Sequence, residues 1–493
     1  MKQPKYPSLY QVNTRVWLTA LSSELGRKAT LDDIPDKALV QLKDLGFDWL
    51  WFLSVWCTGE EGKKISRENP VWRIDFEKTL TDLQEQDIAG SGFAITGYQV
   101  HPDLGGDGAL NRLRKRLRKH GFKLMLDFVP NHMAPDHPWV IDHTDYFVQG
   151  TALDLEKDPL NYTRTKHAEN NLVLAYGRDP YFSGWPDTVQ LDYSNPKTVE
   201  AMTRELLRIA GQCDGVRCDM AMLVLPEIFE KTWGRKAQSF WPDVIKKVHE
   251  NDPAFCFMAE VYWDMEWTLQ QLGFDYAYDK RLYDRLCEGH GKAVREHLYA
   301  GLDYQDKLAR FLENHDEPRA AATFDDSNHK AAAIITFLSP GLRFFHQGQF
   351  AGRKKRISPH LVRAPHEPIN DDLQNFYIKL LDLLKKPIFR NGIWSLLECR
   401  SAWQGNDSSD SFLAFSWEEN NGNRVIVCVN YSSQQGQCYV NLPFPELAEK
   451  QWQLNDLMSD ASYDRDGNDL LNKGHYLDIP AWHYHVFEIR NLK

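Results

Sequence analysis

The sequence has no long uncharged apolar stretch and no closely spaced pair of cysteines. No window approaches the ~18 apolar residues of a membrane span, and the first residues show no cleavable apolar segment. The eight cysteines include no Cys-x-x-Cys pair, and most lie in apolar runs such as VIVCVN. We therefore expect buried free thiols, no zinc site and a cytoplasmic protein.

An excess of positive charge is also lacking. The chain has 58 Lys and Arg against 69 Asp and Glu, which gives a formal net charge of −11. An acidic surface argues against a broad nucleic-acid footprint. The sequence therefore predicts no nucleic-acid partner and no membrane partner.

What the chain does contain is a repeated alternation of short apolar strands and helical patterns. Its 493 residues exceed what one ordinary core uses, so several domains are expected. Helical spacing is seen at 35–46, 108–121 and 198–211. This alternation predicts an α/β fold with a closed (β/α)₈ barrel. Eight segments read as its strands: 8–18, 48–56, 122–130, 215–220, 254–263, 273–279, 308–316 and 341–349.

Three stretches depart from this alternation. Residues 132–195 are rich in Asp, Asn, Pro and aromatic residues, lack helical period, and predict an irregular inserted domain after the third strand. Residues 57–92 form another insertion, part of it helical. From about 390 the pattern becomes alternating with Asn/Gly turns, which predicts a C-terminal all-β domain. The expected domains are 1–131 with 196–389, 132–195, and 390–493.

Polar residues gather at the ends of the predicted barrel strands, where barrel enzymes build their active sites. The stretch GVRCDM places Arg217 and Asp219 on one strand face, since positions two apart share a face. The guanidinium is expected to keep Asp219 ionised. A single carboxylate at a strand end, such as Asp219, could be a capping residue or one member of a structural ion pair. The strand-end residues are Asp127, Asn131, His132, Arg217, Asp219, Glu260, Asn314, His315, Asp316 and Arg319.

Taken together and in this order, these segments resemble the α-amylase family of retaining α-glucan enzymes. The signature segments fall at 127–132, 215–219, 260 and 314–316, and QLDYSNP at 190–196 resembles a fifth. The loop ITGYQVHPDLGG resembles the one that carries a sugar-stacking tyrosine, which matches Tyr98. The resemblance covers the whole chain and implies the family's barrel, inserted and C-terminal domains.

The resemblance also implies roles for individual residues. Asp219 matches the nucleophile, Glu260 the general acid/base, and Asp316 the third carboxylate. Cleavage with retention needs one protonated and one ionised carboxyl about 5 Å apart, which neighbouring strands can provide. The expected oligosaccharide-binding residues are Tyr98, Asp127, Asn131, His132, Arg217, Tyr262, His315 and Arg319.

Three departures from the family pattern affect the expected activity. Met222 and Leu223 stand where many members carry a Lys-His pair on the acceptor side, and Tyr262 with Trp263 could supply stacking there. Gln190 stands where calcium-dependent members carry Asp, so no cofactor is expected and calcium binding should be weak or absent. The 57–92 insertion, beside Tyr98, could close one end of the cleft.

Three functions remain open from the sequence. The favoured one is a retaining hydrolase of α-glucosidic linkages in maltooligosaccharides or α-glucans, with a covalent glycosyl-enzyme intermediate. The second is a transglycosylase or sugar phosphorylase of the same family, since the acceptor depends on loop shape. The third is a catalytically silent binding protein, which the three retained carboxylates disfavour.

Overall fold

The computed structural model describes residues 3–166 and 172–492. Eight parallel strands close into a barrel in the order β1-β15-β14-β13-β12-β11-β5-β2. Each predicted segment contains one of these strands, so the predicted (β/α)₈ barrel is confirmed. The strands are β1 (Ser8–Asn13), β2 (Trp49–Leu53), β5 (Lys123–Phe128), β11 (Gly215–Cys218), β12 (Cys256–Ala259), β13 (Tyr276–Tyr278), β14 (Leu308–Arg310) and β15 (Leu342–His346).

Helices connect the barrel strands, and those predicted at 35–46, 108–121 and 198–211 correspond to α2, α5 and α8. In α5 the buried residues Leu110, Leu113 and Leu117 repeat at helical spacing, while the basic residues stay outside. The helices of this part are α1 (Thr14–Leu25), α2 (Asp36–Asp44), α5 (Gly106–Lys119), α8 (Pro196–Ala210), α9 (Pro226–Trp233), α10 (Trp241–Asn251), α11 (Glu266–Gln271), α12 (Lys280–Glu288), α13 (Gly291–His297), α14 (Leu302–Gln305), α15 (Ala320–Thr323), α16 (Asp326–Leu338), α17 (Asp371–Leu384) and α18 (Pro387–Asn391).

The first predicted strand is wrong beyond Asn13. The side chain of Asn13 accepts a hydrogen bond from the backbone N–H of Val16 at 3.4 Å and caps α1. The apolar residues that follow, including Leu18 and Leu21, are buried at helical spacing. The chain therefore turns from strand to helix without a linker.

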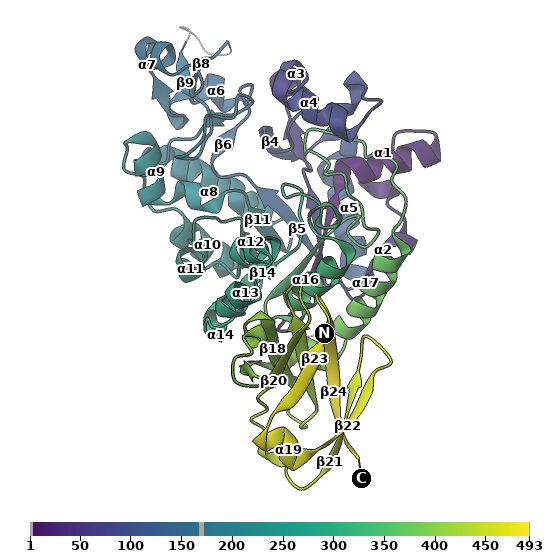
Figure 1. Ribbon diagram of the computed structural model, residues 1–493. Helices are drawn as coiled ribbons and strands as arrows, with labels where there is room; N and C mark the ends of the chain where they lie inside the picture. The colour runs from purple at the N-terminus through teal and green to yellow at the C-terminus, as the bar shows by residue number, and fades with distance from the viewer. Residues whose placement is uncertain (1–2, 167–171, 493) are drawn as a thin grey trace.

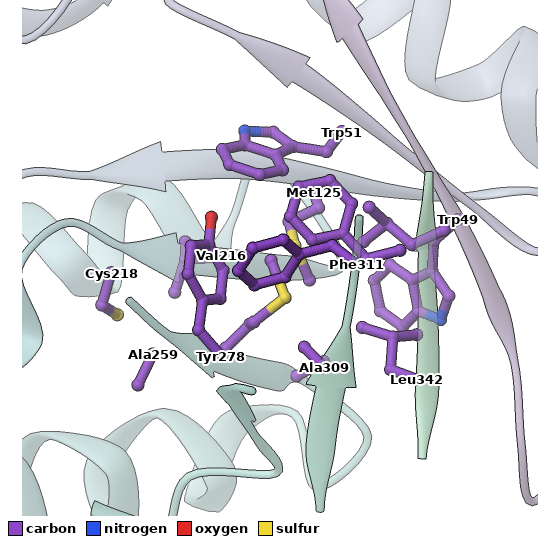
Figure 2. Close-up of a cluster of buried hydrophobic side chains, with 14 of the residues drawn as sticks. Trp49, Trp51, Met125, Val216, Cys218, Ala259, Tyr278, Ala309, Phe311 and Leu342 are labelled. Carbon is purple, nitrogen blue, oxygen red and sulfur yellow. The ribbon is translucent and has the colours of Figure 1, made fainter. Parts of the chain in front are cut away.

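The inside of the barrel is filled by large side chains from alternate strand positions (Figure 2). Trp49 and Trp51 of β2 are both buried, as their two-residue spacing requires. Beside them, Gly215 opens β11, where a Cβ atom would lie 2.7 Å from the carbonyl oxygen of Cys256 and 3.1 Å from the Trp49 ring. Glycine at this position makes room for the tryptophan.

The inserted domain after β5 is built from short elements. Strand β6 (His132–Met133) pairs antiparallel with β10 (Val189–Gln190), and β9 (Val173–Ala175) lies between β7 (Gln149–Gly150) and β8 (Tyr162–Arg164). Two short helices, α6 (Trp139–Asp142) and α7 (Ala152–Lys157), interrupt a segment that the sequence predicts to be non-helical.

The 57–92 insertion carries helices α3 (Glu60–Glu68) and α4 (Pro70–Thr79), between the paired strands β3 (Trp56–Thr58) and β4 (Ile95–Val100). Figure 1 shows α3 and α4, like α7 and β8 of the inserted domain, at the end of the barrel opposite the C-terminal domain. Both insertions therefore lie at the same end of the barrel.

The C-terminal part forms one six-stranded and one three-stranded sheet, with a short helix, as expected for an all-β domain. Trp417 ties it to the barrel by donating its indole N–H to the carbonyl of Leu338 at 2.7 Å. The predicted boundary at 389–390 falls inside α18, and the domain limits stay predictions. The elements are β16 (Ile393–Leu397), β17 (Cys399–Ser401), β18 (Phe412–Glu418), β19 (Arg424–Asn430), β20 (Gly436–Val440), β21 (Gln451–Asp456), β22 (Ser462–Asp466), α19 (Gly467–Asn472), β23 (His475–Ile479) and β24 (Tyr484–Leu492).

Within residues 3–166 and 172–492, none of the helices combines the length and apolar character needed to cross a lipid bilayer.

Candidate active site

A cavity of about 400 Å³ opens at the carboxyl ends of the barrel strands. Asp219 follows β11 directly, Glu260 follows β12, and Asp316 lies beyond β14. All three carboxyl groups line this cavity, which we call the active-site pocket. The structure thus brings the three predicted carboxylates together from three strands.

Arg217 links these carboxylates. Its Nη1 donates to Asp219 Oδ1 at 2.7 Å, and its Nη2 donates to Glu260 Oε2 at 2.7 Å. Asp127 and Asp316 lie 3.8 and 4.0 Å from the same guanidinium, which is 1% exposed. Burial alone would lower the pKa of Arg217, but Glu260 and Asp219 raise it well above its usual range. One buried cation therefore holds two carboxyl groups side by side.

The surroundings of Glu260 favour its protonated form. Burial raises the pKa of Glu260 to about 8, and the charges of Asp219 and Asp316 add to this effect, while Arg217 opposes it. Met220, in a left-handed conformation with φ 40°, donates its N–H to Glu260 Oε2 at 2.7 Å. The hydroxyl of Tyr262 donates to Oε1 at 2.9 Å. These two donors favour the ionised carboxylate and offset part of the rise in the pKa of Glu260. A carboxyl group in this environment can supply a proton near neutral pH.

Asp316 is more accessible, with 41% of its side chain exposed. Its loop is fixed because Asn314 Oδ1 accepts hydrogen bonds from the N–H groups of Asp316 and Glu317 at 2.8 and 2.9 Å. His315 Nε2 lies 3.1 Å from Asp316 Oδ2, and Gln11 Nε2 lies 2.8 Å from His315 Nδ1. This arrangement leaves Asp316 free to accept hydrogen bonds from a ligand.

Both predicted histidines are buried and neutral at physiological pH. Burial lowers the pKa of His132, and it lowers the pKa of His315 well below its usual range. His132 lines the active-site pocket and packs on Trp185, with ring centroids 5.3 Å apart. A neutral imidazole can donate one hydrogen bond and accept another.

Asp127 lies beside Arg217, with Oδ1 3.8 Å from Nη1 of the guanidinium. It accepts hydrogen bonds from the indole N–H of Trp51 at 3.1 Å and from the backbone N–H of Ser54 at 2.9 Å. Burial raises the pKa of Asp127 to about 7, and Arg217 opposes this shift. Asp127 therefore supports the guanidinium from the barrel side.

Comparison with known proteins follows this geometry. The family model described as "Alpha amylase, catalytic domain" matches residues 30–422. The chain belongs to the alpha-amylase family. The family assignment agrees with the resemblance seen in the sequence.

Individual relatives cover the chain to different extents. The chain is 23% identical over 317 residues to alpha-amylase 3 of Dictyoglomus thermophilum, with 59% of each protein covered. It is 33% identical over 149 residues to an alpha-1,4-glucan:maltose-1-phosphate maltosyltransferase of Cereibacter sphaeroides, covering 29% of this chain and 20% of that relative. Its fold is similar to that of the maltogenic alpha-amylase AmyB of Thermotoga neapolitana, at TM-score 0.70, 20% identity and 99% coverage of both chains.

Of the eight side chains expected from the sequence to bind sugar, His132 and Tyr262 line the pocket. Four more are buried: Asn131, Arg217 and His315 contact lining residues, and Asp127 contacts Arg217. Tyr98 and Arg319 contact other buried groups instead. Tyr98 is 1% exposed, and its hydroxyl donates to the carbonyl of Val129 at 2.9 Å, so its stacking role stays a prediction. Arg319 is 3% exposed and pairs with the buried Glu313 at 3.0 Å, so its sugar contact also stays a prediction. Both side chains satisfy buried polar groups of the barrel.

The pocket also contains residues that no sequence pattern singled out. Phe93 stacks on His315 with ring centroids 5.4 Å apart. Aromatic residues in the 57–92 insertion were the available signal, but their position depends on how that insertion folds back. The additional lining residues include Trp72, Phe76, Phe93, Trp185, Asp187, Arg356 and His360.

The acceptor-side positions are apolar and buried. Met222 and Leu223 lie in a short 3₁₀ helix, Ala221–Val224, and are packed in the core. Tyr262 lines the active-site pocket and also a wider neighbouring cavity that contains Trp263. Tyr262 and Trp263 are therefore the aromatic side chains available on this side.

The family's calcium position does not fit a cation in this chain. Gln190 is fully buried, and its Nε2 donates to Asn131 O at 2.9 Å, to Asn131 Oδ1 at 3.0 Å and to Leu191 O at 3.1 Å. These oxygens are the kind of ligand that calcium would use. An amide donor from the chain occupies their lone pairs instead, so the amide and a cation would compete for them.

Proposed function

We propose that this protein is a retaining glycoside hydrolase that cleaves α-glucosidic linkages in short α-glucans. The proposal rests on one observation, the bridging of Asp219 and Glu260 by the two terminal nitrogens of Arg217. Retaining enzymes place a nucleophile and an acid/base about 5 Å apart. Two carboxyl groups bound to one guanidinium suit that separation.

In the first step, Asp219 attacks the anomeric carbon and the bond to the leaving oxygen breaks. Glu260 gives its proton to that oxygen, so the leaving sugar departs as an alcohol and Asp219 carries a glycosyl ester. In the second step, Glu260 takes a proton from water, which attacks the anomeric carbon and frees Asp219. We propose that Asp316 and His132, which line the pocket, bind the hydroxyls of the reacting sugar, and that the buried His315 orients Asp316.

Substrate length is proposed to be limited by the insertion. Helix α4 contributes Trp72 and Phe76 to the active-site pocket, and the loop after β15 contributes His360. The Trp72 and His360 rings lie 4.7 Å apart, and the backbone N–H of Ala89 donates to His360 O at 2.9 Å. A buried cluster of Phe76, Leu80, Ile88 and Leu361 joins the two segments. These contacts support a pocket closed at one end.

The acceptor side is proposed to lie beyond Tyr262. Trp263 packs against Tyr181 of the inserted domain, with ring centroids 5.0 Å apart at 75°. Tyr181 is 57% exposed and Trp263 36% exposed. Exposed aromatic faces at the end of a pocket can stack on sugar rings.

A transferase is the second candidate, because the chain is similar to an alpha-1,4-glucan:maltose-1-phosphate maltosyltransferase over 149 residues. In that case a sugar or phosphate replaces water in the second step. The retained carboxylates argue against a silent binding protein. The cytoplasmic location and the absence of nucleic-acid and membrane partners stay predictions.

Two measurements test the proposal. Proton NMR of fresh product should detect the α anomer first, and an initial β anomer would contradict the assignment of Asp219 as nucleophile. Product analysis on maltose, maltoheptaose, sucrose, trehalose and starch, with and without phosphate, separates hydrolysis from transfer. A net increase in reducing ends without formation of longer oligosaccharides supports the hydrolase, since transfer between sugars leaves the number of reducing ends unchanged.

A further inference from the structure

A second cavity of about 430 Å³ lies between α1, α3 and the turn that follows β4. It shares none of its lining residues with the active-site pocket. We call it the basic cavity, because cationic side chains outnumber carboxylates there although the chain has a net charge of −11. Its charged residues are Arg15, Lys28, Lys63, Arg67, Glu60 and Asp103.

Arg15 is the most buried of these cations, at 8% exposure. Its Nη1 donates to Gly90 O at 2.8 Å and its Nη2 to Thr58 Oγ1 at 3.4 Å, both neutral acceptors. Burial lowers the pKa of Arg15 to about 10, and Asp103 opposes this shift, so the group stays cationic near neutral pH. Asp103 itself is paired with Lys28.

Within the described residues, Arg15 has no ion-pair partner. A buried cation without an opposite charge is energetically costly unless an anion is supplied. The cavity beside it offers room for one, and a volume of this size is typical of small-ligand sites.

The remaining cations of the basic cavity are only partly neutralised. Lys63 lies 3.3 Å from Glu60, which is largely exposed. Arg67 donates from Nε to Ile88 O at 3.2 Å, and its nearest carboxylate, Glu85, is 3.9 Å away. Thr19 and Ser22 line the same wall, with their hydroxyls donating to Arg15 O at 2.9 Å and to Leu18 O at 2.6 Å, so that their oxygens act there as acceptors. The lining therefore combines a cationic part with neutral hydrogen-bonding groups.

We propose that the basic cavity binds the phosphate group of a small phosphorylated sugar. Guanidinium groups bind phosphate through paired N–H donors, and Arg15, Arg67 and Lys63 line one cavity. The hydroxyl oxygen of Thr19, whose own proton goes to Arg15 O, can accept a hydrogen bond from the sugar body. This proposal is independent of the proposed hydrolase activity, because phosphate binding to the basic cavity can be measured without catalytic turnover.

The position of Arg15 couples this site to the active-site pocket. Ile88 and Ala89 line the basic cavity, whereas Ser91 lines the active-site pocket. Arg15 holds the carbonyl of Gly90 between them, and a Cβ atom on Gly90 would lie 2.9 Å from Lys63 Cα. Segment 88–91 therefore separates the two cavities. A ligand bound to Arg15 affects this segment through the hydrogen bond from Arg15 to Gly90 O. By linkage, phosphate and substrate then change each other's affinity.

Calorimetric titration of the full chain with inorganic phosphate and, separately, with glucose 1-phosphate tests the site at constant ionic strength. Lys63→Gln should weaken phosphate binding about threefold or more. Lys64→Gln is the matched control, because it removes the same charge from the same helix at an exposed position outside the cavity. Arg15→Gln should abolish binding, and Arg15→Lys, which keeps the charge, should weaken it if the Gln variant does not fold.

Equal weakening by Lys63→Gln and Lys64→Gln, or no binding at millimolar phosphate, overturns the site. A maltooligosaccharide could displace the bound phosphate while Lys63→Gln leaves phosphate binding unchanged. That result would place the ion in the active-site pocket and would also overturn the proposed site. If glucose 1-phosphate binds no more tightly than inorganic phosphate, the proposal that the cavity also binds the sugar is wrong. The coupling is supported if phosphate changes the KM of the wild type but not that of Lys63→Gln. It is overturned if phosphate leaves the KM of the wild type unchanged.

Discussion

Replacing Tyr262 by Phe should move the alkaline limb of the pH–activity profile to higher pH. Glu260 acts as an acid only when protonated, so activity should fall as pH rises through its pKa of about 8. The Tyr262 hydroxyl donates to Glu260 Oε1 at 2.9 Å, and a donor favours the ionised carboxylate. Removing that donor therefore raises the pKa of Glu260.

The size of the shift follows from hydrogen-bond energies. A hydrogen bond to a charged group contributes about 1.5–3 kcal/mol and one between neutral groups about 1 kcal/mol, so the difference is about 1 kcal/mol. At 1.36 kcal/mol per pKa unit, the shift is about 0.7 unit.

The assay is kcat/KM against pH on a chromogenic maltooligosaccharide, which reports the free enzyme. Tyr299→Phe is the matched control, because Tyr299 is 67% exposed and lies outside the pocket. A limb that stays in place or moves to lower pH in Tyr262→Phe would refute the assignment of Glu260 as the acid.

Three further outcomes are expected. Glu260→Gln and Asp219→Asn should each lower kcat by about a hundredfold or more with unchanged circular dichroism, and activity within tenfold of wild type would remove the residue from the mechanism. A chelator should leave the melting temperature and activity unchanged, because Gln190 already fills the cation position; inactivation reversed by calcium would contradict this. Trp72→Ala should lower kcat/KM for maltotriose about two- to tenfold and raise starch cleavage relative to it; equal effects from Trp267→Ala, outside the pocket, would argue against a closed end.

The barrel could be predicted because its strands are short apolar runs that alternate with amphipathic helices. The catalytic candidates could be predicted because a strand end fixes where Asp219 and Glu260 lie, whatever the loops do. The same reasoning failed at Asn13, where one side-chain cap turns an apolar run from strand into helix. Local pattern carries little information about such a cap.

The rest of the pocket depends on contacts between distant segments. Tyr98 and Phe93 are five positions apart, and the fold of the loop decides which of them meets the pocket and which fills the core. Arg319 follows other polar residues in the sequence, but its guanidinium forms an ion pair with the buried Glu313. Trp72 reaches the pocket because α4 packs on the loop after β15, which no pattern within 57–92 encodes.

The single guanidinium shared by Asp219 and Glu260 has a consequence for the timing of the two half-reactions. The negative charge of Asp219 is one of the causes that raise the pKa of Glu260. In the proposed mechanism Asp219 becomes an ester and loses that charge, while the positive charge of Arg217 stays 2.7 Å from Glu260. The pKa of Glu260 then falls without any movement of the chain. The same carboxyl group is thus an acid while the nucleophile is free and a base once it is occupied, so formation of the covalent bond itself resets the site for the second step.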